Sequence, residues 1–344
     1  MITARDVAEK LGIAVSTVGR AMADDPRISA KTKAKVRKAA ERMGYVGNNP
    51  ARVMRGGSSK LIGLMIPDVA NDFYGSVAQT LSTCFDREGY GLVLSLTGDD
   101  REREMRQIRE LVGARVAGII LVPTARPKRE SKRMLSQIAH IQFLRRHSAL
   151  GQTWFGMDDS AVVKSATRYL IERGHRHIGY IGANDVISTG AARANGFRMA
   201  FSESAVAHHP ELERHGVPTV EYGEAAAEDL LARARRVPSA IITGSIHITL
   251  GLIRYIERAK IKTPEQLSLI GFGEAPWFEW WRGGLTTIQP SAEDLATSCG
   301  LWFLEQVRKG KIEPLPAYAS VTISKLAIRS SVAEPMMDRR RRID

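Results

Sequence analysis

The sequence predicts an α/β protein with a small all-α segment at its N-terminus and a body of two doubly wound subdomains. Two pattern observations support this fold class: three short amphipathic helices occur in the first 46 residues, and from Leu61 onward short apolar runs alternate with longer amphipathic stretches. Apolar strands separated by helices are typical of parallel βαβ units. A third observation separates the N-terminal segment from the body: the first 60 residues are strongly basic, with 13 Lys and Arg against 5 Asp and Glu.

The composition excludes several classes of protein. With 344 residues, 44% hydrophobic and 25% charged, the chain is typical of globular proteins and is neither disordered nor collagen-like. Its net charge of +13 predicts a polyanionic partner. No apolar run reaches the roughly 18 residues that a membrane span needs, and no secretory segment follows Met1. We therefore expect a cytoplasmic protein without a membrane contact.

The N-terminal segment predicts a helix-turn-helix followed by a third helix. Thr3 caps the first helix, which Gly12 ends; the second helix runs from about Val15 to Met22, and the third begins after Ser29 and ends at Gly44. The apolar positions expected to form their core are Val7, Ala8 and Leu11, then Val18 and Met22, then Val36, Ala39, Ala40 and Met43. The second helix then exposes Val15, Ser16, Gly19 and Arg20 on its other face.

The body predicts eight strands, which fall into two consecutive sets. Their expected ranges are 61–66, 91–96, 118–122, 141–144, 178–181, 217–221, 240–243 and 267–272. Helical stretches separate them, so each set predicts one doubly wound subdomain.

Catalytic and metal-binding motifs do not occur where they would be expected. The chain has no glycine-rich dinucleotide loop after a strand, no GxSxG elbow and no Walker motif. The His pairs at 175/177 and 208/209 lack the helical spacing of a zinc site, and Cys84 and Cys299 lack CxxC spacing. The sequence therefore predicts no enzyme, no cofactor and no metal site. The alternative left open is a small-molecule-binding or enzymatic α/β protein with an incidental basic N-terminus.

Several motifs of the sequence resemble those of the LacI/GalR family of transcriptional regulators. The stretch "TARDVAEKLGIAVSTVGRAM" matches the family's DNA-binding headpiece, and "IERGHRHIGYIG", "RANGFRMA", "LSLIGFGE" and "LTTIQP" match landmarks of its effector domain. The resemblance continues to about residue 330. It implies a periplasmic-binding-protein type of body, with three crossover strands and a ligand cleft between the subdomains.

The resemblance also implies domain boundaries. It predicts a headpiece at 1–46, a hinge helix and linker at 47–59, and an effector-binding and dimerisation domain at 60–334. The N-subdomain would comprise 60–156 and 288–316, and the C-subdomain 157–287 and 317–334. Residues 335–344, which include four consecutive arginines, would form a basic, disordered tail.

DNA contacts are expected from the headpiece and the hinge. In the family the second helix reads base edges, which would place Val15, Ser16 and Arg20 in the major groove, with Thr17 and Tyr45 near phosphates. Arg20 could pair with guanine, although a phosphate contact remains an alternative. The full set implied for DNA binding is Thr3, Val15, Ser16, Thr17, Arg20, Ser29, Thr32, Tyr45, Asn48, Ala51, Arg52 and Met54.

Three positions in this region depart from the family pattern. Ala14 stands where a capping Ser is usual, and Gly19 replaces the Ser of the common "TVSR", so each would weaken the second helix by about 1 kcal/mol. Met54 takes the place of a Leu that wedges between base steps in the minor groove. We expect binding that is weaker or differently specified than in typical members.

The effector cleft is expected to contain the residues that match the family's ligand-binding motifs. These are Phe73, Tyr74, Thr124, Arg145, Arg193, Ser245, Glu274 and Trp277. Ser245 and Gly273 stand where the family has acidic residues, and Arg145 replaces an Asp, so two carboxylates are removed and a third becomes an arginine. Arg145 and Arg193 are then expected to lie unpaired in the cleft, which predicts an anionic effector such as a sugar acid, a sugar phosphate or an organic acid. The alternative is that Arg145 pairs with Asp158, Asp159 or Glu274 and leaves the cleft neutral.

Taken with the basic headpiece, the resemblance predicts a ligand-responsive transcriptional regulator. We expect a repressor that binds a pseudopalindromic operator in double-stranded DNA as a homodimer, because helix-turn-helix dimers read paired half-sites. No leucine-heptad segment occurs at the C-terminus, so a tetramer assembled in that way is not expected.

Overall fold

The structure is a computed structural model that describes residues 2–45, 59–309 and 315–335. The chain divides into two compact units, unit 1 at residues 1–59 and unit 2 at 60–344, and each is described by itself. No helix in the described ranges is long and apolar enough to cross a membrane.

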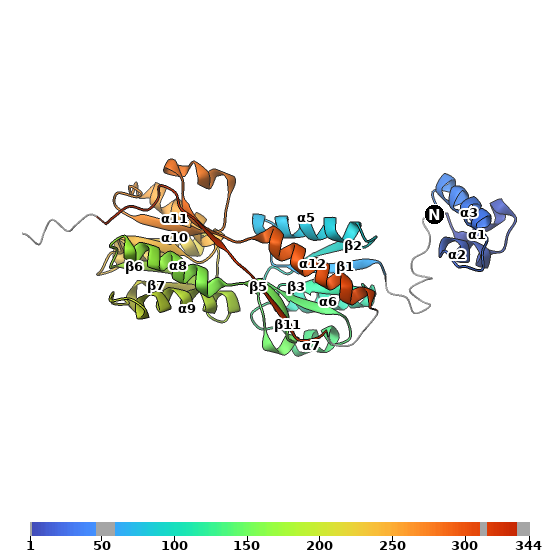
Figure 1. Cartoon of the computed structure of the whole chain (residues 1–344), viewed down its shortest axis with the longest axis horizontal. Helices are drawn as coiled ribbons and strands as arrows, with labels where there is room; N and C mark the ends of the chain where they lie inside the picture. The colour runs from blue at the N-terminus through green and yellow to red at the C-terminus, as the bar shows by residue number, and fades with distance from the viewer. Residues whose placement is uncertain (1, 46–58, 310–314, 336–344) are drawn as a thin grey trace, which may run out of the picture. The chain divides into compact units, whose positions relative to one another are not determined.

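The described part of unit 1, residues 2–45, contains three helices around a small core (Figure 1). They are α1 (Ala4–Leu11), α2 (Val15–Met22) and α3 (Ala30–Met43). Thr3 caps α1 in a capping box, and Gly12 ends it with φ 64°, a left-handed conformation that glycine adopts without strain. The buried side chains are Val7, Ala8, Val18, Ala21, Val36, Ala40 and Tyr45, with Leu11, Met22, Ala39 and Met43 packed against them. The expected core is confirmed, and Ala21 and Tyr45 join it.

The N-terminus of α2 lacks a side-chain cap, as the sequence predicts. Ala14 occupies the N-cap position with an extended backbone, and no side chain accepts a hydrogen bond there. Replacing Ala14 by serine is therefore expected to stabilise unit 1 by about 1 kcal/mol. Thermal unfolding of residues 1–60 would measure this, with Ala14→Val as the control, since valine supplies no hydroxyl and is as poor an N-cap as alanine. An unchanged melting temperature in the serine variant would contradict the prediction.

The first sheet of unit 2 is wholly parallel. Its strand order is β11-β5-β4-β3-β1-β2. The strands are β1 (Leu61–Ile66), β2 (Gly91–Leu96), β3 (Gly118–Leu121), β4 (His140–Phe143), β5 (Thr153–Met157) and β11 (Tyr318–Thr322). Helices α5 (Asp72–Asp86) and α12 (Ala292–Arg308) cover one face, and α6 (Arg101–Gly113) and α7 (Arg129–Leu135) cover the other. This sheet and its helices form the first subdomain.

The second sheet has the order β12-β10-β9-β8-β6-β7, with β12 antiparallel to β10. The strands are β6 (Ile178–Ala183), β7 (Glu213–Gly216), β8 (Ala240–Thr243), β9 (Ser268–Phe272), β10 (Thr286–Gln289) and β12 (Lys325–Ala327). Helices α8 (Asp159–Glu172) and α9 (Ser188–Ser202) cover one face, and α10 (Val220–Glu228) and α11 (Ile246–Arg258) cover the other. These elements form the second subdomain.

Among the described elements the chain passes between the subdomains three times, and all three expected boundaries fall too early, the first because β5 continues to Met157. The crossings lie between β5 and α8, between β10 and α12, and between β11 and β12. Residues 317–334 were expected in the C-subdomain, but β11 pairs with β5 in the first sheet, so that crossing falls after Thr322. The boundary at 288 also falls too early, because β10 continues to Gln289 in the second sheet.

One predicted strand is wrong. Residues 217–221 were expected as a strand, but Thr219 caps the helix that begins at Val220, and Pro218 precedes it. The strand at this place is β7, Glu213–Gly216, which pairs with β6. The internal strands β5 and β10 and the edge strands β11 and β12 were not predicted either.

Candidate functional site

The outer face of α2, which is predicted to read DNA, is exposed. Val15 is 46% exposed, and Ser16 and Arg20 are exposed beside it. Val18 and Ala21 hold the opposite face of the helix in the core. Within the described residues, Arg20 forms no ion pair, so its guanidinium is available to a ligand in solution.

The other expected DNA contacts fall into three groups. Thr3 and Ser29 cap α1 and α3, and Ser29 Oγ accepts a hydrogen bond from the backbone of Thr32 at 3.2 Å. Thr17 is half-buried, and Tyr45 packs in the core with 9% of its surface exposed. A phosphate contact by Tyr45 would therefore involve only the edge of its side chain. Outside the described residues lie Asn48, Ala51, Arg52 and Met54.

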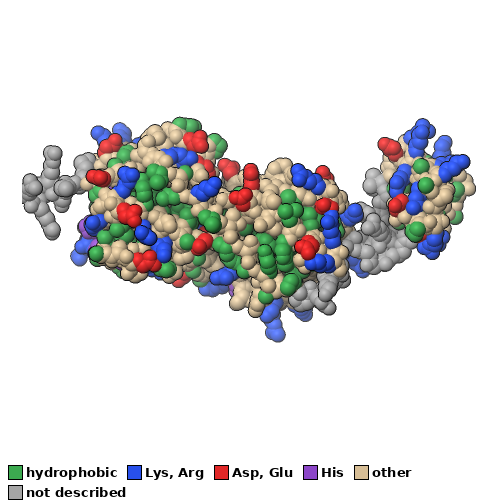
Figure 2. Space-filling view, viewed as in Figure 1, with side chains coloured by type: hydrophobic (Ala, Val, Ile, Leu, Met, Phe, Trp, Pro, Cys, Tyr) green, Lys and Arg blue, Asp and Glu red, His purple; other side chains and the backbone are tan. Residues whose placement is uncertain are grey.

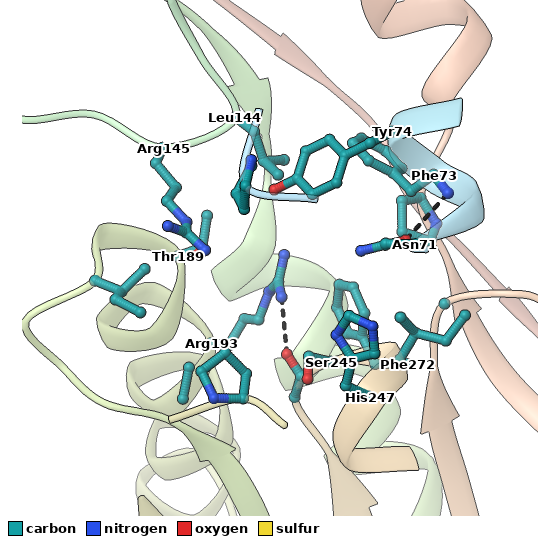
Figure 3. Close-up of a pocket in the computed structure, with 18 of the residues that line it drawn as sticks. Asn71, Phe73, Tyr74, Leu144, Arg145, Thr189, Arg193, Ser245, His247 and Phe272 are labelled. Carbon is teal, nitrogen blue, oxygen red and sulfur yellow. Dashed lines mark hydrogen bonds between the residues drawn. The ribbon is translucent and has the colours of Figure 1, made fainter. Parts of the chain in front are cut away.

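A cleft in unit 2 is lined by residues of both subdomains. It encloses about 750 Å³ of space, part of it open to solvent. Five of the eight expected effector residues line it: Phe73, Tyr74, Arg145, Arg193 and Ser245. Figure 3 shows the Arg145 and Arg193 side chains pointing into the cleft from opposite sides. The remaining polar lining comes from Asp68, Asn71, Asp99, Thr189 and His247.

Arg145 is paired, but with a residue that the sequence analysis did not name. Its Nη1 and Nη2 donate to the two carboxylate oxygens of Asp99, the second at 3.1 Å. Asp99 follows β2 in a turn where its φ is 56°. The expectation that Arg145 has no partner is therefore wrong, and so is the alternative that pairs it with Asp158, Asp159 or Glu274.

Arg193 is held by three contacts at the base of the cleft. Its Nε donates to Asp159 Oδ1 at 2.7 Å, its Nη1 donates to the carbonyl of Gly244 at 2.8 Å, and its guanidinium lies 3.8 Å from the centre of the Phe272 ring. Burial raises the pKa of the Asp159 carboxyl, and the adjacent guanidinium of Arg193 opposes that rise. Arg193 thus fixes α9 against α8 and the loop after β8.

The remaining cleft residues are fixed by local backbone contacts. Asn71 caps α5 and accepts from the backbone of Phe73 at 3.1 Å, and Ser245 caps α11. Burial raises the pKa of Tyr74 to about 12, so its phenol is neutral and can donate a hydrogen bond. The cleft therefore offers donors and acceptors in fixed positions together with aromatic surface.

Three expected effector residues lie outside the cleft lining. Thr124 is buried, and its backbone N–H donates to Glu104 at 2.7 Å. Glu274 accepts from Thr287 and pairs with Arg329, and Trp277 packs beside Phe278. These three side chains support the packing of unit 2.

Four polar cleft residues were not predicted from the sequence, although each lies just after a strand or in the first turn of a helix. Asp68 and Asp99 follow β1 and β2, and ligands of parallel sheets gather at the carboxyl ends of strands. Thr189 lies in the first turn of α9 and His247 in the first turn of α11, at the same edge of the second sheet. The strand ends could thus have indicated all four.

The fold and the site define a protein with a basic helix-turn-helix unit and a separate unit that encloses a polar small-molecule cleft. Residues 3–48 match the family model described as bacterial regulatory proteins of the lacI family, and residues 167–332 match a periplasmic binding protein-like domain. The chain therefore combines a lacI-family helix-turn-helix domain with a periplasmic-binding-protein-like domain, the two parts found in bacterial transcriptional regulators.

Similar proteins share nearly the full length of the chain. The HTH-type transcriptional regulator GalR of Escherichia coli (strain K12) is 27% identical over 339 residues, which are 98% of each chain. The HTH-type transcriptional repressor PurR of Pectobacterium carotovorum subsp. carotovorum (strain PC1) is 28% identical over 348 residues, covering 99% of this chain and 100% of that one. The crystal structure of the lac repressor dimer bound to operator and the anti-inducer ONPF has the same fold, with a TM-score of 0.80, 19% identity and coverage of 96% and 99%.

Proposed function

We propose that this protein is a ligand-responsive, sequence-specific repressor that acts in the cytoplasm as a homodimer on a pseudopalindromic operator. The observation that carries the proposal is the exposed face of α2, with Val15, Ser16 and Arg20, in the same chain as a cleft lined by both subdomains of unit 2. An exposed helix with an unpaired arginine suits base readout in the major groove. The expected minor-groove contacts of Asn48, Ala51, Arg52 and Met54 remain predictions.

Selection from a pool of random-sequence duplexes tests this function. We expect the full-length protein to enrich one pseudopalindromic site and to bind it at least a thousand times more tightly than unrelated DNA. The affinity should fall steeply as salt rises, because basic side chains displace counterions from phosphates. Equal affinity for all duplexes would contradict sequence-specific regulation.

Replacing Arg20 by alanine is expected to relax the sequence preference at one position of each half-site. If Arg20 reads a base, the variant should lose about 1 to 3 kcal/mol on the selected site and much less on random DNA. Titration of both duplexes with wild type and variant measures this, and Arg5→Ala on the exposed side of α1 serves as the control. A uniform loss on all duplexes would assign Arg20 to a phosphate.

We further propose that the effector is a hydroxy acid with a single negative charge, such as a sugar acid. Asp68 and Asp99 line the cleft together with Arg145 and Arg193, so the lining has no excess of positive charge to bind a doubly charged phosphate. Within the described residues, Arg193 Nη2 and Arg145 Nε make no hydrogen bond, so each can still donate to a carboxylate. Asp68 and Asp99 can accept from hydroxyl groups.

Calorimetry with a matched panel tests the effector class. The panel contains a six-carbon sugar acid, the corresponding neutral sugar and the corresponding sugar phosphate. We expect only the sugar acid to bind tightly, and Arg145→Ala to weaken it by tenfold or more, since a charge-assisted hydrogen bond contributes about 1.5 to 3 kcal/mol. Arg146→Ala is the control, because Arg146 stacks on Trp154 outside this cleft.

A neutral polyhydroxylated effector is the second candidate, and the two Arg–Asp pairs favour it. Each pair presents a donor and an acceptor with no net charge, which suits a sugar hydroxyl. Tight binding of the neutral sugar to wild type and to Arg145→Ala alike, with no binding of the acid, would establish this second candidate.

A further inference from the structure

Four cationic side chains form a continuous row along α3. Positions 31, 35, 38 and 42 follow the spacing of one helix face, and all four side chains are exposed. We call Lys31, Lys35, Lys38 and Arg42 the α3 row. It faces away from Val36 and Ala40, through which α3 packs in the core of unit 1. Figure 2 shows Lys and Arg side chains gathered over this part of unit 1.

Ion pairs distinguish the row from the other cations of α3. Lys33 Nζ lies 3.2 Å and Arg37 Nη2 lies 2.9 Å from Asp24 Oδ1, so one carboxylate serves both. Within residues 2–45, no member of the row forms an ion pair, and Glu41, the one acidic residue of α3, forms none with them. The fold thus pairs two cations of this helix with one carboxylate and leaves the four cations of the row without an ion pair in this part of the chain.

The row works against the stability of the helix that carries it. Lys31 and Lys35, and likewise Lys38 and Arg42, are like charges four residues apart, and such pairs destabilise a helix. Lys31 also lies in the first turn, which contains no acidic residue, although the helix dipole disfavours cations there. Helix stability accounts at most for Arg42, which lies in the last turn where the dipole favours a cation, whereas a polyanionic partner would account for all four residues.

The dimensions of the row fit the regular charge spacing of a duplex. The eleven helical steps from Lys31 to Arg42 span about 16 Å, which is long enough for the row to face several phosphates of a duplex. The row belongs to a different helix from the recognition face of α2. We propose that the α3 row is a second DNA-contact surface, which binds the phosphate backbone of a duplex segment other than the operator held by α2.

A capture experiment tests this surface on the full-length protein. The operator duplex recovered by selection is immobilised and saturated with protein, and a labelled 40-base-pair duplex of unrelated sequence is then added. We expect wild type to retain the second duplex. The variant K31Q/K35Q/K38Q/R42Q should retain at least tenfold less at low salt, while its operator affinity stays within threefold. For the second duplex, the slope of log affinity against log salt should fall by about 3 to 4, since each lost phosphate contact contributes about 0.9.

A matched control removes four exposed cations from unit 2. The variant R87Q/K132Q/R133Q/K262Q has the same net charge and should capture the second duplex like wild type. The α3 variant should also melt at a higher temperature than wild type, which verifies that it is folded. Equal capture by the α3 variant and wild type would overturn the proposal. A loss of operator affinity as large as the loss of second-duplex capture would also overturn it, because the row would then bind the operator. Tighter capture of single-stranded RNA than of duplex DNA would contradict it as well.

Discussion

Replacing Arg193 by alanine is expected to lower the free energy of unfolding of unit 2 by about 3 to 5 kcal/mol. The guanidinium is buried with Asp159, which is 4% exposed. Its removal leaves a carboxylate in the core without its partner and also frees the carbonyl of Gly244. The same variant should lose its response to effector, because Arg193 also lines the cleft. Denaturant unfolding followed by tryptophan fluorescence measures the first effect.

Two variants calibrate this result. Arg168→Ala removes an exposed ion pair with Glu172 on the neighbouring helix α8 and should cost less than 1 kcal/mol. The double variant Asp159→Ala with Arg193→Ala should be less destabilised than the sum of its single variants, because neither charge is then left alone. A loss below 1 kcal/mol for Arg193→Ala would show that the buried pair does not hold α8 and α9 together.

Acid is expected to destabilise unit 2 through Glu213 by up to about 3 kcal/mol. Burial alone would raise the pKa of this carboxyl, but hydrogen bonds from His215, Arg198 and His208 lower the pKa to about 2. A lowered pKa means that the ionised carboxylate stabilises the folded state above about pH 4.5, and that this stabilisation is lost as the pH falls toward 2. Unfolding free energies at pH 7, 4 and 2.5 measure the effect.

The variant Glu213→Gln isolates this carboxylate. It should be less stable than wild type at pH 7 by about the same 3 kcal/mol, and the difference should shrink as the pH falls below 4.5. Glu172→Gln, with an exposed carboxylate, should leave the pH profile unchanged. A difference between wild type and Glu213→Gln that stays constant from pH 7 to pH 4 would contradict the assignment.

Periodicity predicted the elements whose burial depends on apolar side chains. The helices of unit 1 and strands such as β1 and β8 carry continuous apolar faces, and the structure confirms them. It failed at β7, because Glu213–Gly216 contains no aliphatic or aromatic residue and is ordered by pairing with β6 and by the ion pairs of Glu213. A strand was predicted at 217–221 instead, because Val217 and Val220 are β-branched. Pro218 and the cap at Thr219 in fact start a helix there.

Cleft residues could be predicted only where they belong to a sequence motif of the family. Arg145 and Arg193 were placed correctly by resemblance, yet their partners depend on where loops from other strands return. Asp99 reaches Arg145 because its turn adopts a positive φ after β2, and 46 residues separate the two in sequence. No local pattern encodes such a pair, and the inference of an unpaired arginine failed for that reason.

The last strands of the chain have a consequence for synthesis on the ribosome. β11 completes the first sheet at β5, and β12 completes the second at β10, although both come after residue 317. A nascent chain that has emerged as far as α12 therefore exposes an unpaired edge on each sheet at once. Such edges favour pairing between chains, so unit 2 should depend on chaperone protection until its final strands leave the exit tunnel.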